Sequence, residues 1–185
     1  MEIREAQLAD LDALIELSRD TFEETFGYLY PLADLQKFLA TAYTQESYTE
    51  QIQGADSNIW VLVDGEKLCG YVTAGNCILP HPEVRAEDGE IKRIYLRATY
   101  QKGGWGTRLF ETALDWLISR GKSTIWLGVW SNNYGAQKLY RRHGFTHAGE
   151  YHFVVGENRD RAFIYRKIVT EEEKSHRAAE RGAES

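Results

Sequence analysis

A short stretch in the middle of the chain constrains the fold most, because a strand pattern runs into a glycine-rich turn that opens onto a helix. The strand pattern covers Glu90–Leu96, the turn reads Gln101-Lys-Gly-Gly-Trp-Gly106, and helical spacing begins at Thr107. Three of the four positions from 103 to 106 are glycine, which lacks the Cβ atom that would hold a ligand away from the backbone. Free N–H groups at a helix start, together with the helix dipole, favour an anion. The stretch therefore predicts an anion site of the kind that binds a pyrophosphate.

Length and composition are those of a single soluble domain. The chain has 185 residues, of which 43% are hydrophobic and 27% charged, and a chain of this size buries roughly 70% of its unfolded surface. No apolar run approaches the ~20 residues that span a bilayer, and the first residues lack the apolar core of a secretory signal. We therefore expect a cytoplasmic protein without membrane contact, with one domain over residues 1–169 and a charged, disordered tail over 170–185.

Charge and cysteine usage exclude several classes of partner. The net charge is −6, whereas a nucleic-acid-binding protein normally presents a basic face, so we expect no nucleic-acid partner. The acidic balance is compatible with a cationic substrate. Cys69 and Cys77 are expected to be reduced thiols. The five histidines show no metal-ligand spacing, so we expect no metal site.

The apolar pattern predicts strands and helices along the whole chain. Asp64-Gly65 is typical of a hairpin turn, and residues 78–89, with two prolines and several charges, indicate a surface loop. Predicted strands begin at Ile3 and cover 58–63, 68–73, 90–96, 124–130, 146–155 and 161–168; predicted helices cover 10–26, 31–39, 107–120 and 132–143.

A second motif lies in the last predicted helix and reads Asn133-x-x-Ala136-x-x-x-Tyr140-x-x-x-Gly144-Phe145. Ala136 and Tyr140 are four residues apart, so they share a helix face, and Asn133 lies one turn before them. That face presents an amide, a small gap and a phenol. Taken alone, the motif favours a tyrosine packed into the core and an asparagine that caps the helix.

Together, the two motifs resemble those of the GCN5-related N-acetyltransferase (GNAT) superfamily, and the resemblance covers about residues 3–168. It implies an α/β fold with a mixed, mostly antiparallel central sheet, two splayed parallel strands, and helices on both faces. The splayed strands would be 90–96 and 124–130. The resemblance also implies acetyl-CoA as cosubstrate and transfer of the acetyl group to a primary amine by direct attack in a ternary complex.

The resemblance implies a set of residues that bind acetyl-CoA. Backbone groups of Ile94 and Leu96 would pair with the pantetheine arm, and the amides of Gln101 to Thr107 would hold the pyrophosphate. Lys102, Lys138, Arg141 or Arg142 would reach the adenosine phosphates, and the sequence does not decide among these four. The full expected set is Ile94, Tyr95, Leu96, Gln101, Lys102, Gly103, Gly104, Trp105, Gly106, Thr107, Asn133, Ala136 and Lys138.

Acetyl transfer to an amine calls for two catalytic groups. An amine attacks only when neutral, so a general base is useful, and the leaving thiolate benefits from an acid. Tyr140 stands where the superfamily places its phenol acid. Glu90 occupies the strand position of the glutamate base in some histone-acetylating members. The alternative for Glu90 is an exposed carboxylate at a strand start, or an ion pair with Lys92 or Arg93.

Three further segments resemble the PaiA-type polyamine acetyltransferases, which are similar to spermidine/spermine N-acetyltransferases in activity. The segments are Thr21–Phe26, Ile125–Trp130 and Gly149–Phe153, and the resemblance implies a small amine acceptor, such as a polyamine. Two departures stand out. Trp105 stands where a smaller aliphatic residue is common in the superfamily. The segment Arg161–Tyr165 lacks the acidic residue expected beside its aromatic one, and without that carboxylate one contact to an amine would be missing.

Other candidates for acceptor binding are less specific. Asp20, Glu23 and Glu24 would attract a cation, although charges on an exposed helix are usually only solvated. Tyr28, Tyr30 and His152 are candidates to line the acceptor site. Two alternatives for function stay open: an acetyltransferase for a protein N-terminus or lysine, and a non-catalytic acyl-CoA-binding sensor. We expect a monomer or a homodimer, and no surface in the sequence identifies an interface.

Overall fold

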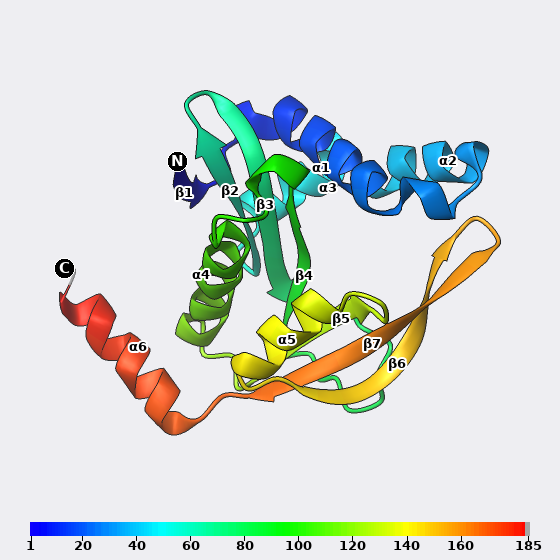
Figure 1. Cartoon of the computed structure of the whole chain (residues 1–185). Coiled ribbons are helices and arrows are strands. Elements are labelled where there is room, and N and C mark those ends of the chain that lie inside the picture. The colour runs from blue at the N-terminus through cyan, green and yellow to red at the C-terminus, as the bar shows by residue number, and fades with distance from the viewer. Residues whose placement is uncertain (184–185) are drawn as a thin grey trace.

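The computed structural model describes residues 1–183, which form one central sheet with helices on both of its faces (Figure 1). The strands are β1 (Glu2–Glu5), β2 (Ser57–Asp64), β3 (Lys67–Asn76), β4 (Gly89–Leu96), β5 (Thr124–Trp130), β6 (Thr146–Val155) and β7 (Asn158–Ile168). The α-helices are α1 (Leu11–Phe26), α2 (Leu32–Ala42), α3 (Gln45–Gln53), α4 (Trp105–Ser119), α5 (Tyr134–Arg142) and α6 (Glu171–Ala183). Short 3-10 turns are η1 (Leu8–Asp10), η2 (Gly27–Leu29) and η3 (Ala98–Tyr100).

The sheet has the strand order β1-β2-β3-β4-β5-β7-β6. Every neighbouring pair is antiparallel except β4 and β5, which are parallel. The pairing between β4 and β5 covers only Gly89–Ile91 against Ile125–Leu127, and the two strands diverge beyond it (Figure 1). The predicted fold, a mixed and mostly antiparallel sheet with two splayed parallel strands, is therefore confirmed.

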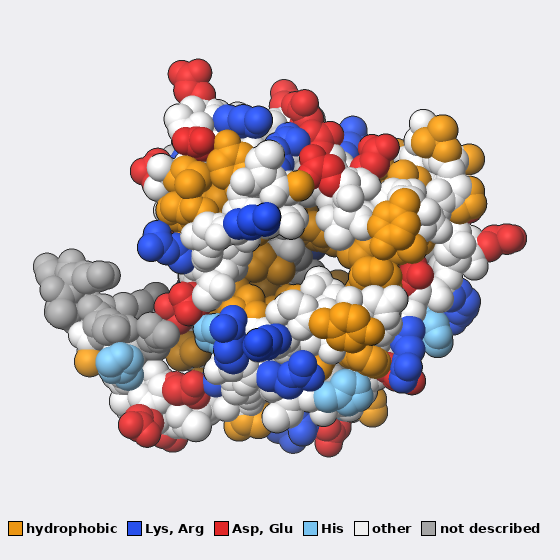
Figure 2. All heavy atoms as spheres, in the orientation of Figure 1, with side chains coloured by type: hydrophobic (Ala, Val, Ile, Leu, Met, Phe, Trp, Pro, Cys, Tyr) orange, Lys and Arg blue, Asp and Glu red, His pale blue; other side chains and the backbone are white. Residues whose placement is uncertain are grey.

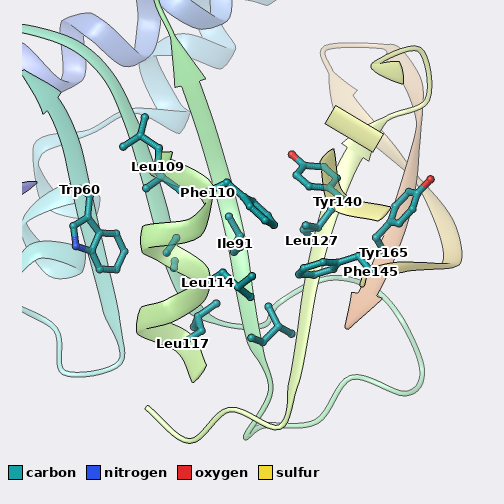
Figure 3. Packing of buried hydrophobic residues seen from close by; sticks show 14 of the residues in the cluster. Trp60, Ile91, Leu109, Phe110, Leu114, Leu117, Leu127, Tyr140, Phe145 and Tyr165 are labelled. Atoms are coloured by element: carbon teal, nitrogen blue, oxygen red, sulfur yellow. The ribbon is translucent and has the colours of Figure 1, made fainter. Parts of the chain in front are cut away.

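Two hydrophobic clusters hold the helices against the two faces of the sheet. In β2, Trp60 and Leu62 point into one cluster, while Ile59, Val61 and Val63 point into the other, because side chains alternate along a strand. The first cluster includes α4 residues and Tyr140 of α5, as Figure 3 shows, and the second includes residues of α1, α2 and α3. The central strands are thus buried on both faces.

Some predicted boundaries differ from those in the structure. Helix α2 begins at Leu32, with Pro31 as the preceding cap residue, and α4 begins at Trp105 rather than Thr107. The β2–β3 turn consists of Gly65 and Glu66, since Asp64 pairs with Lys67. Helix α3 was not predicted, because few of its residues are apolar and only Tyr48 is buried.

Within the segment 170–185, for which the sequence predicts a disordered tail, Glu171–Ala183 form the helix α6. A capping box starts it: the Thr170 hydroxyl oxygen accepts a hydrogen bond from the Glu173 amide, and the Glu173 carboxylate accepts one from the Thr170 amide. Glu173 also forms an ion pair with the buried Lys167. Helix α6 therefore begins at a specific, side-chain-capped position.

The predicted surface loop between β3 and β4 is also partly buried. Asp88 is 4% exposed and accepts a hydrogen bond of 2.8 Å from the indole N–H of Trp126 on β5. The His81 ring lies 4.9 Å from that of Trp126. The end of the loop therefore packs against the central parallel strands, and the prediction of a purely surface segment is wrong there.

Candidate functional site

The site begins where β4 and β5 diverge. We call the region beyond the Ile91–Leu127 pair the β4–β5 opening. From Arg93 to Leu96, β4 pairs with β3 on one edge, while on the edge that faces the opening no strand among the described residues pairs with it. Backbone groups along that edge are available to a ligand that binds as an extra strand would.

The glycine-rich turn forms the start of α4 at the end of this opening. Gly104 has φ +74°, a left-handed conformation that favours glycine, and no side chain caps the helix. The first helical hydrogen bond runs from the Arg108 amide to the Gly104 carbonyl. The amides at positions 105–107 thus precede the helical hydrogen-bond pattern, as an anion site requires.

A hollow in the surface lies at this place. Figure 2 shows it between α4, β4 and α5, with hydrophobic side chains at its floor and Lys and Arg side chains on the rim formed by α5. The basic residues of α5 are Lys138, Arg141 and Arg142. The rim formed by α5 is therefore positively charged, across the hollow from α4.

Trp105 is accommodated by the glycine that precedes it in the turn. A Cβ atom on Gly103 would lie only 2.8 Å from the Trp105 ring, so a larger residue at position 103 would displace the indole. On its other side, the Arg108 guanidinium lies 4.7 Å from the Trp105 ring centroid, within range of a cation–π contact. The departure at Trp105 is therefore compatible with the turn.

Helix α5 positions its motif residues through a cap and through the core. The Asn133 side chain accepts a hydrogen bond of 3.1 Å from the Ala136 amide and so caps the helix. Tyr140 is 5% exposed, and its ring centroid lies 5.3 Å from that of Phe110. Figure 3 shows the Tyr140 ring between β4 and β5, with its hydroxyl directed away from Phe145. Burial raises the pKa of Tyr140, so the phenol is protonated at neutral pH.

Glu90 is a buried carboxylate, not an exposed one. It is 5% exposed and accepts a hydrogen bond of 2.9 Å from the Ile78 amide. Among the described residues it forms no ion pair with Lys92 or Arg93, and the Arg93 guanidinium instead lies over the Tyr43 ring. Burial raises the pKa of Glu90, with the Ile78 hydrogen bond acting in the opposite direction. A carboxylate with a raised pKa is a better proton acceptor.

A pocket of about 110 Å³ opens beside the β4–β5 opening. Its residues come from α1, from the strands β4, β5, β6 and β7, and from Tyr30 just after η2, and most of its wall is aromatic. The Phe26 and Trp130 rings meet edge to face, with their centroids 5.6 Å apart. The lining residues are Phe22, Phe26, Tyr30, Lys92, Tyr95, Gly128, Val129, Trp130, Tyr151, Phe153, Asp160 and Ala162.

Asp160 is the carboxylate in the wall of the pocket, and none of the sequence motifs includes it. Its Oδ2 atom accepts a hydrogen bond of 2.5 Å from the Tyr30 hydroxyl. The acidic residue expected within Arg161–Tyr165 is absent, but Asp160 stands one residue earlier on β7. Asp160 and Ala162 are two apart and line the same pocket, so a period-2 pattern extended toward the start of the strand would have found it.

Of the acceptor-site candidates from the sequence, Tyr30 lines this pocket, and Asp20, Glu23, Glu24, Tyr28 and His152 do not. Asp20 and Glu24 form ion pairs with Arg97, at 2.9 and 3.9 Å, and so do not present free charges. Tyr28 is 75% exposed and His152 is also exposed, whereas Tyr30 lines the pocket. Of the two tyrosines after α1, only Tyr30 contributes to the pocket.

Within residues 1–183, no group of three His, Cys, Asp or Glu residues has the arrangement of a metal site. Cys69 and Cys77 are both free thiols. None of the helices described is long and apolar enough to cross a membrane.

Comparisons with known proteins agree on one family. Residues 12–145 match the family model described as "Acetyltransferase (GNAT) family". An uncharacterised N-acetyltransferase from Lactobacillus delbrueckii subsp. lactis is 36% identical over 161 residues, which cover 86% of this chain and 92% of that protein. A spermidine N(1)-acetyltransferase from Thermoplasma acidophilum is 24% identical over 149 residues, with 78% and 88% covered. The crystal structure of a PaiA N-acetyltransferase from Thermoplasma acidophilum in complex with coenzyme A superposes with a TM-score of 0.71 at 21% identity, and the match covers 91% of this chain and 98% of that one.

Proposed function

The chain belongs to the acetyltransferase (GNAT) family and is an acetyl-CoA-dependent N-acetyltransferase, and from that premise we propose that its acceptor is a polyamine. The observation that carries the proposal is Asp160 in the wall of the aromatic pocket beside the β4–β5 opening. Carboxylates and aromatic faces both bind ammonium groups. Similarity to a spermidine N(1)-acetyltransferase supports the same class of acceptor.

The proposed acetyl-CoA site uses the opening on the side of α4 and α5. The amides of positions 105–107 bind the pyrophosphate at the start of α4, which no side chain caps. The edge of β4 from Lys92 to Leu96 pairs with the pantetheine arm, and the Asn133 amide group contacts the same arm. The adenosine phosphates bind one or more of the basic residues Lys102, Lys138, Arg141 and Arg142.

The proposed acceptor site holds two amino groups in different environments. One ammonium group binds Asp160, between the rings of Tyr30 and Trp130. The reacting amine lies nearer the opening, beside Lys92. A neighbouring cation disfavours a second positive charge, so Lys92 lowers the pKa of that amine and favours its neutral, nucleophilic form.

The proposed reaction is direct attack in a ternary complex. The amine nitrogen forms a bond to the thioester carbonyl carbon, and the carbon–sulfur bond breaks with its electrons leaving on sulfur. Glu90 receives the proton that the nitrogen loses, and the protonated Tyr140 donates a proton to the thiolate. The raised pKa of Glu90 makes it a better proton acceptor, and the raised pKa of Tyr140 keeps the phenol protonated, so that it holds a proton to donate.

The experiment that tests the acceptor is CoA release from acetyl-CoA across a panel of amines. The panel contains spermidine, spermine, putrescine, propylamine, aminoglycosides and short peptides with free N-termini. We expect the highest kcat/KM with spermidine or spermine, because these present a second ammonium group to Asp160. Preferred turnover of peptides would contradict the polyamine proposal in favour of a protein acceptor. Tight acetyl-CoA binding without turnover of any amine would favour a sensor.

A variant of Asp160 makes this test specific. Asp160→Asn keeps the size of the side chain and removes its charge. The ammonium group then loses a charge-assisted hydrogen bond, so we expect the KM for spermidine to rise about 10-fold or more. The KM for propylamine, which has no second ammonium group, should not change. Equal effects on both amines would mean that Asp160 does not bind the remote ammonium group.

A further inference from the structure

Tyr151 reaches the β4–β5 opening from two strands away. It lies on β6 and pairs with Ala162 on β7, which in turn pairs with Trp130 on β5. Its hydroxyl ends against Gly128 of β5, where a Cβ atom would lie only 2.6 Å from the Tyr151 oxygen. The side chain therefore extends across β7 to β5, and the small residues Ala162 and Gly128 line the pocket along that path.

The end point of this side chain is the place where the two parallel strands separate. The last pair between β4 and β5 is Ile91 with Leu127, so Gly128 is the first residue of β5 past the pairing. Tyr151, Gly128 and Lys92 line the same pocket. The Tyr151 hydroxyl thus lies between the acceptor pocket and the β4–β5 opening.

Glu90 pairs with Trp126 on β5, and Gly128 lies two residues further along that strand, so the Glu90 side chain and the Tyr151 hydroxyl approach the same face of β5. Burial raises the pKa of Tyr151 to about 12, and the negative charge of Glu90 contributes in the same direction. The phenol is therefore protonated at neutral pH. Among the described residues it has no hydrogen-bond partner, although its neighbour Tyr30 has Asp160. It is free to donate one hydrogen bond and to accept another.

We propose that Tyr151 is a catalytic residue that contacts the attacking nitrogen and relays its proton to Glu90. The proposal rests on the role of Glu90 as the base. After the nitrogen has bonded to the carbonyl carbon, one N–H proton passes to the Tyr151 oxygen while the Tyr151 proton passes to the Glu90 carboxylate. The N–H electron pair stays on nitrogen, and the phenol is neutral before and after the transfer. The thiolate that leaves takes its proton from Tyr140.

The close approach of Tyr151 explains why β5 has a glycine at position 128. Position 128 lies between the bulky residues Trp126 and Trp130, which point to the same side of β5. A glycine there weakens a strand, and in strands it often marks close approach of another group. In this chain the approaching group is the Tyr151 hydroxyl.

The first test compares Tyr151→Phe with wild type. Loss of a proton relay predicts a kcat about 100-fold lower, with the dissociation constant for acetyl-CoA unchanged. Tyr28→Phe, a change of the same kind at an exposed tyrosine outside the pocket, is the matched control and should keep full activity. Circular dichroism and thermal unfolding establish that both variants are folded. An unchanged kcat in a folded Tyr151→Phe enzyme would overturn the proposal.

The second test displaces the hydroxyl without removing it. In Gly128→Ala the new methyl group meets the end of the Tyr151 side chain, so the ring must move away from the opening. We expect a fall in kcat similar to that of Tyr151→Phe. The double variant should be no slower than either single variant, because both remove the same hydroxyl contact. Multiplicative losses in the double variant would contradict a shared cause.

The third test asks whether Tyr151 and Glu90 act in series. Glu90→Gln alone, Tyr151→Phe alone and the double variant should have similar kcat values if one relay contains both groups. Independent, multiplicative effects would overturn the relay. Spermidine, propylamine and an alanine-terminated tetrapeptide are used as acceptors, because the relay acts on the nitrogen that all three share. Absence of spermidine turnover in wild type would contradict the polyamine proposal alone.

Discussion

Glu90 is a carboxylate inside the sheet, and its hydrogen-bond partners are the Ile78 amide and the Cys77 thiol, not a cation. Transfer of a carboxylate from water into such an environment disfavours its charged form, and its raised pKa follows from that burial. Such a residue destabilises the fold when ionised. Its presence at the β4–β5 opening is therefore better explained by chemistry than by stability.

The pH dependence of turnover and of stability tests this interpretation. The base must be ionised, so we expect kcat/KM to fall as pH decreases through the raised pKa of Glu90 in the free enzyme. The free energy of unfolding should change with pH in the direction opposite to kcat/KM. Between the pKa of the unfolded chain and the higher pKa of the folded protein, the folded state binds more protons, so stability decreases as pH rises through that window.

Glu90→Gln separates the two effects. It should lose most activity at every pH, and its free energy of unfolding relative to wild type should increase as pH rises through the same window. Urea unfolding from pH 4 to pH 8 measures this difference. If the free energy of unfolding of Glu90→Gln differs from that of wild type by the same amount at every pH, ionisation of Glu90 does not destabilise the folded protein.

At the scale of the elements, the residues that could be predicted are those whose signal is local. The glycines fix the turn before α4, and apolar periodicity gives β4, β5 and α5 to within two residues at each end. Tyr151 and Asp160 could not be assigned in this way, because strands β6 and β7 bring them to the opening only through the sheet topology. Their position depends on pairing partners that are distant in sequence.

Helix α6 begins at a capping box that its highly charged composition does not indicate. The residues from Thr170 onward are highly charged and lack an apolar stripe, which is typical of disorder. However, Thr170 and Glu173 have the spacing of a capping box, and Lys167 supplies a cation for Glu173. The cap and the ion pair hold the first turn where apolar burial does not.

A variant of the cap tests this account of α6. Thr170→Ala removes the hydroxyl that accepts from the Glu173 amide, so we expect α6 to be destabilised by about 1 kcal/mol. Hydrogen exchange in residues 171–176 should become faster, with turnover unchanged. Ser175→Ala, which removes a hydroxyl from the same helix but leaves the cap, is the control. Equal acceleration in both variants would show that the capping box does not hold the helix.

At the scale of the whole molecule, the short pairing between β4 and β5 separates the sheet into two groups of strands. Strands β1–β4 lie on one side of the opening and β5, β7 and β6 on the other, and only three residue pairs join β4 to β5. The two hydrophobic clusters lie on opposite faces of this sheet. A cosubstrate that pairs with β4 inside the opening would therefore connect the two sides of the molecule through backbone hydrogen bonds.

Hydrogen exchange with and without acetyl-CoA tests that arrangement. We expect slower exchange in residues 92–96, whose free edge would pair with the pantetheine arm, and in residues 103–107, whose amides would bind the pyrophosphate. Residues 60–63 of β2, which already pair on both edges, are the internal control and should not change. At saturating acetyl-CoA, about 100 times its dissociation constant, the free energy of unfolding should rise by about 2.7 kcal/mol. Stabilisation of that size without protection of residues 92–96 would mean that acetyl-CoA binds without pairing to the edge of β4.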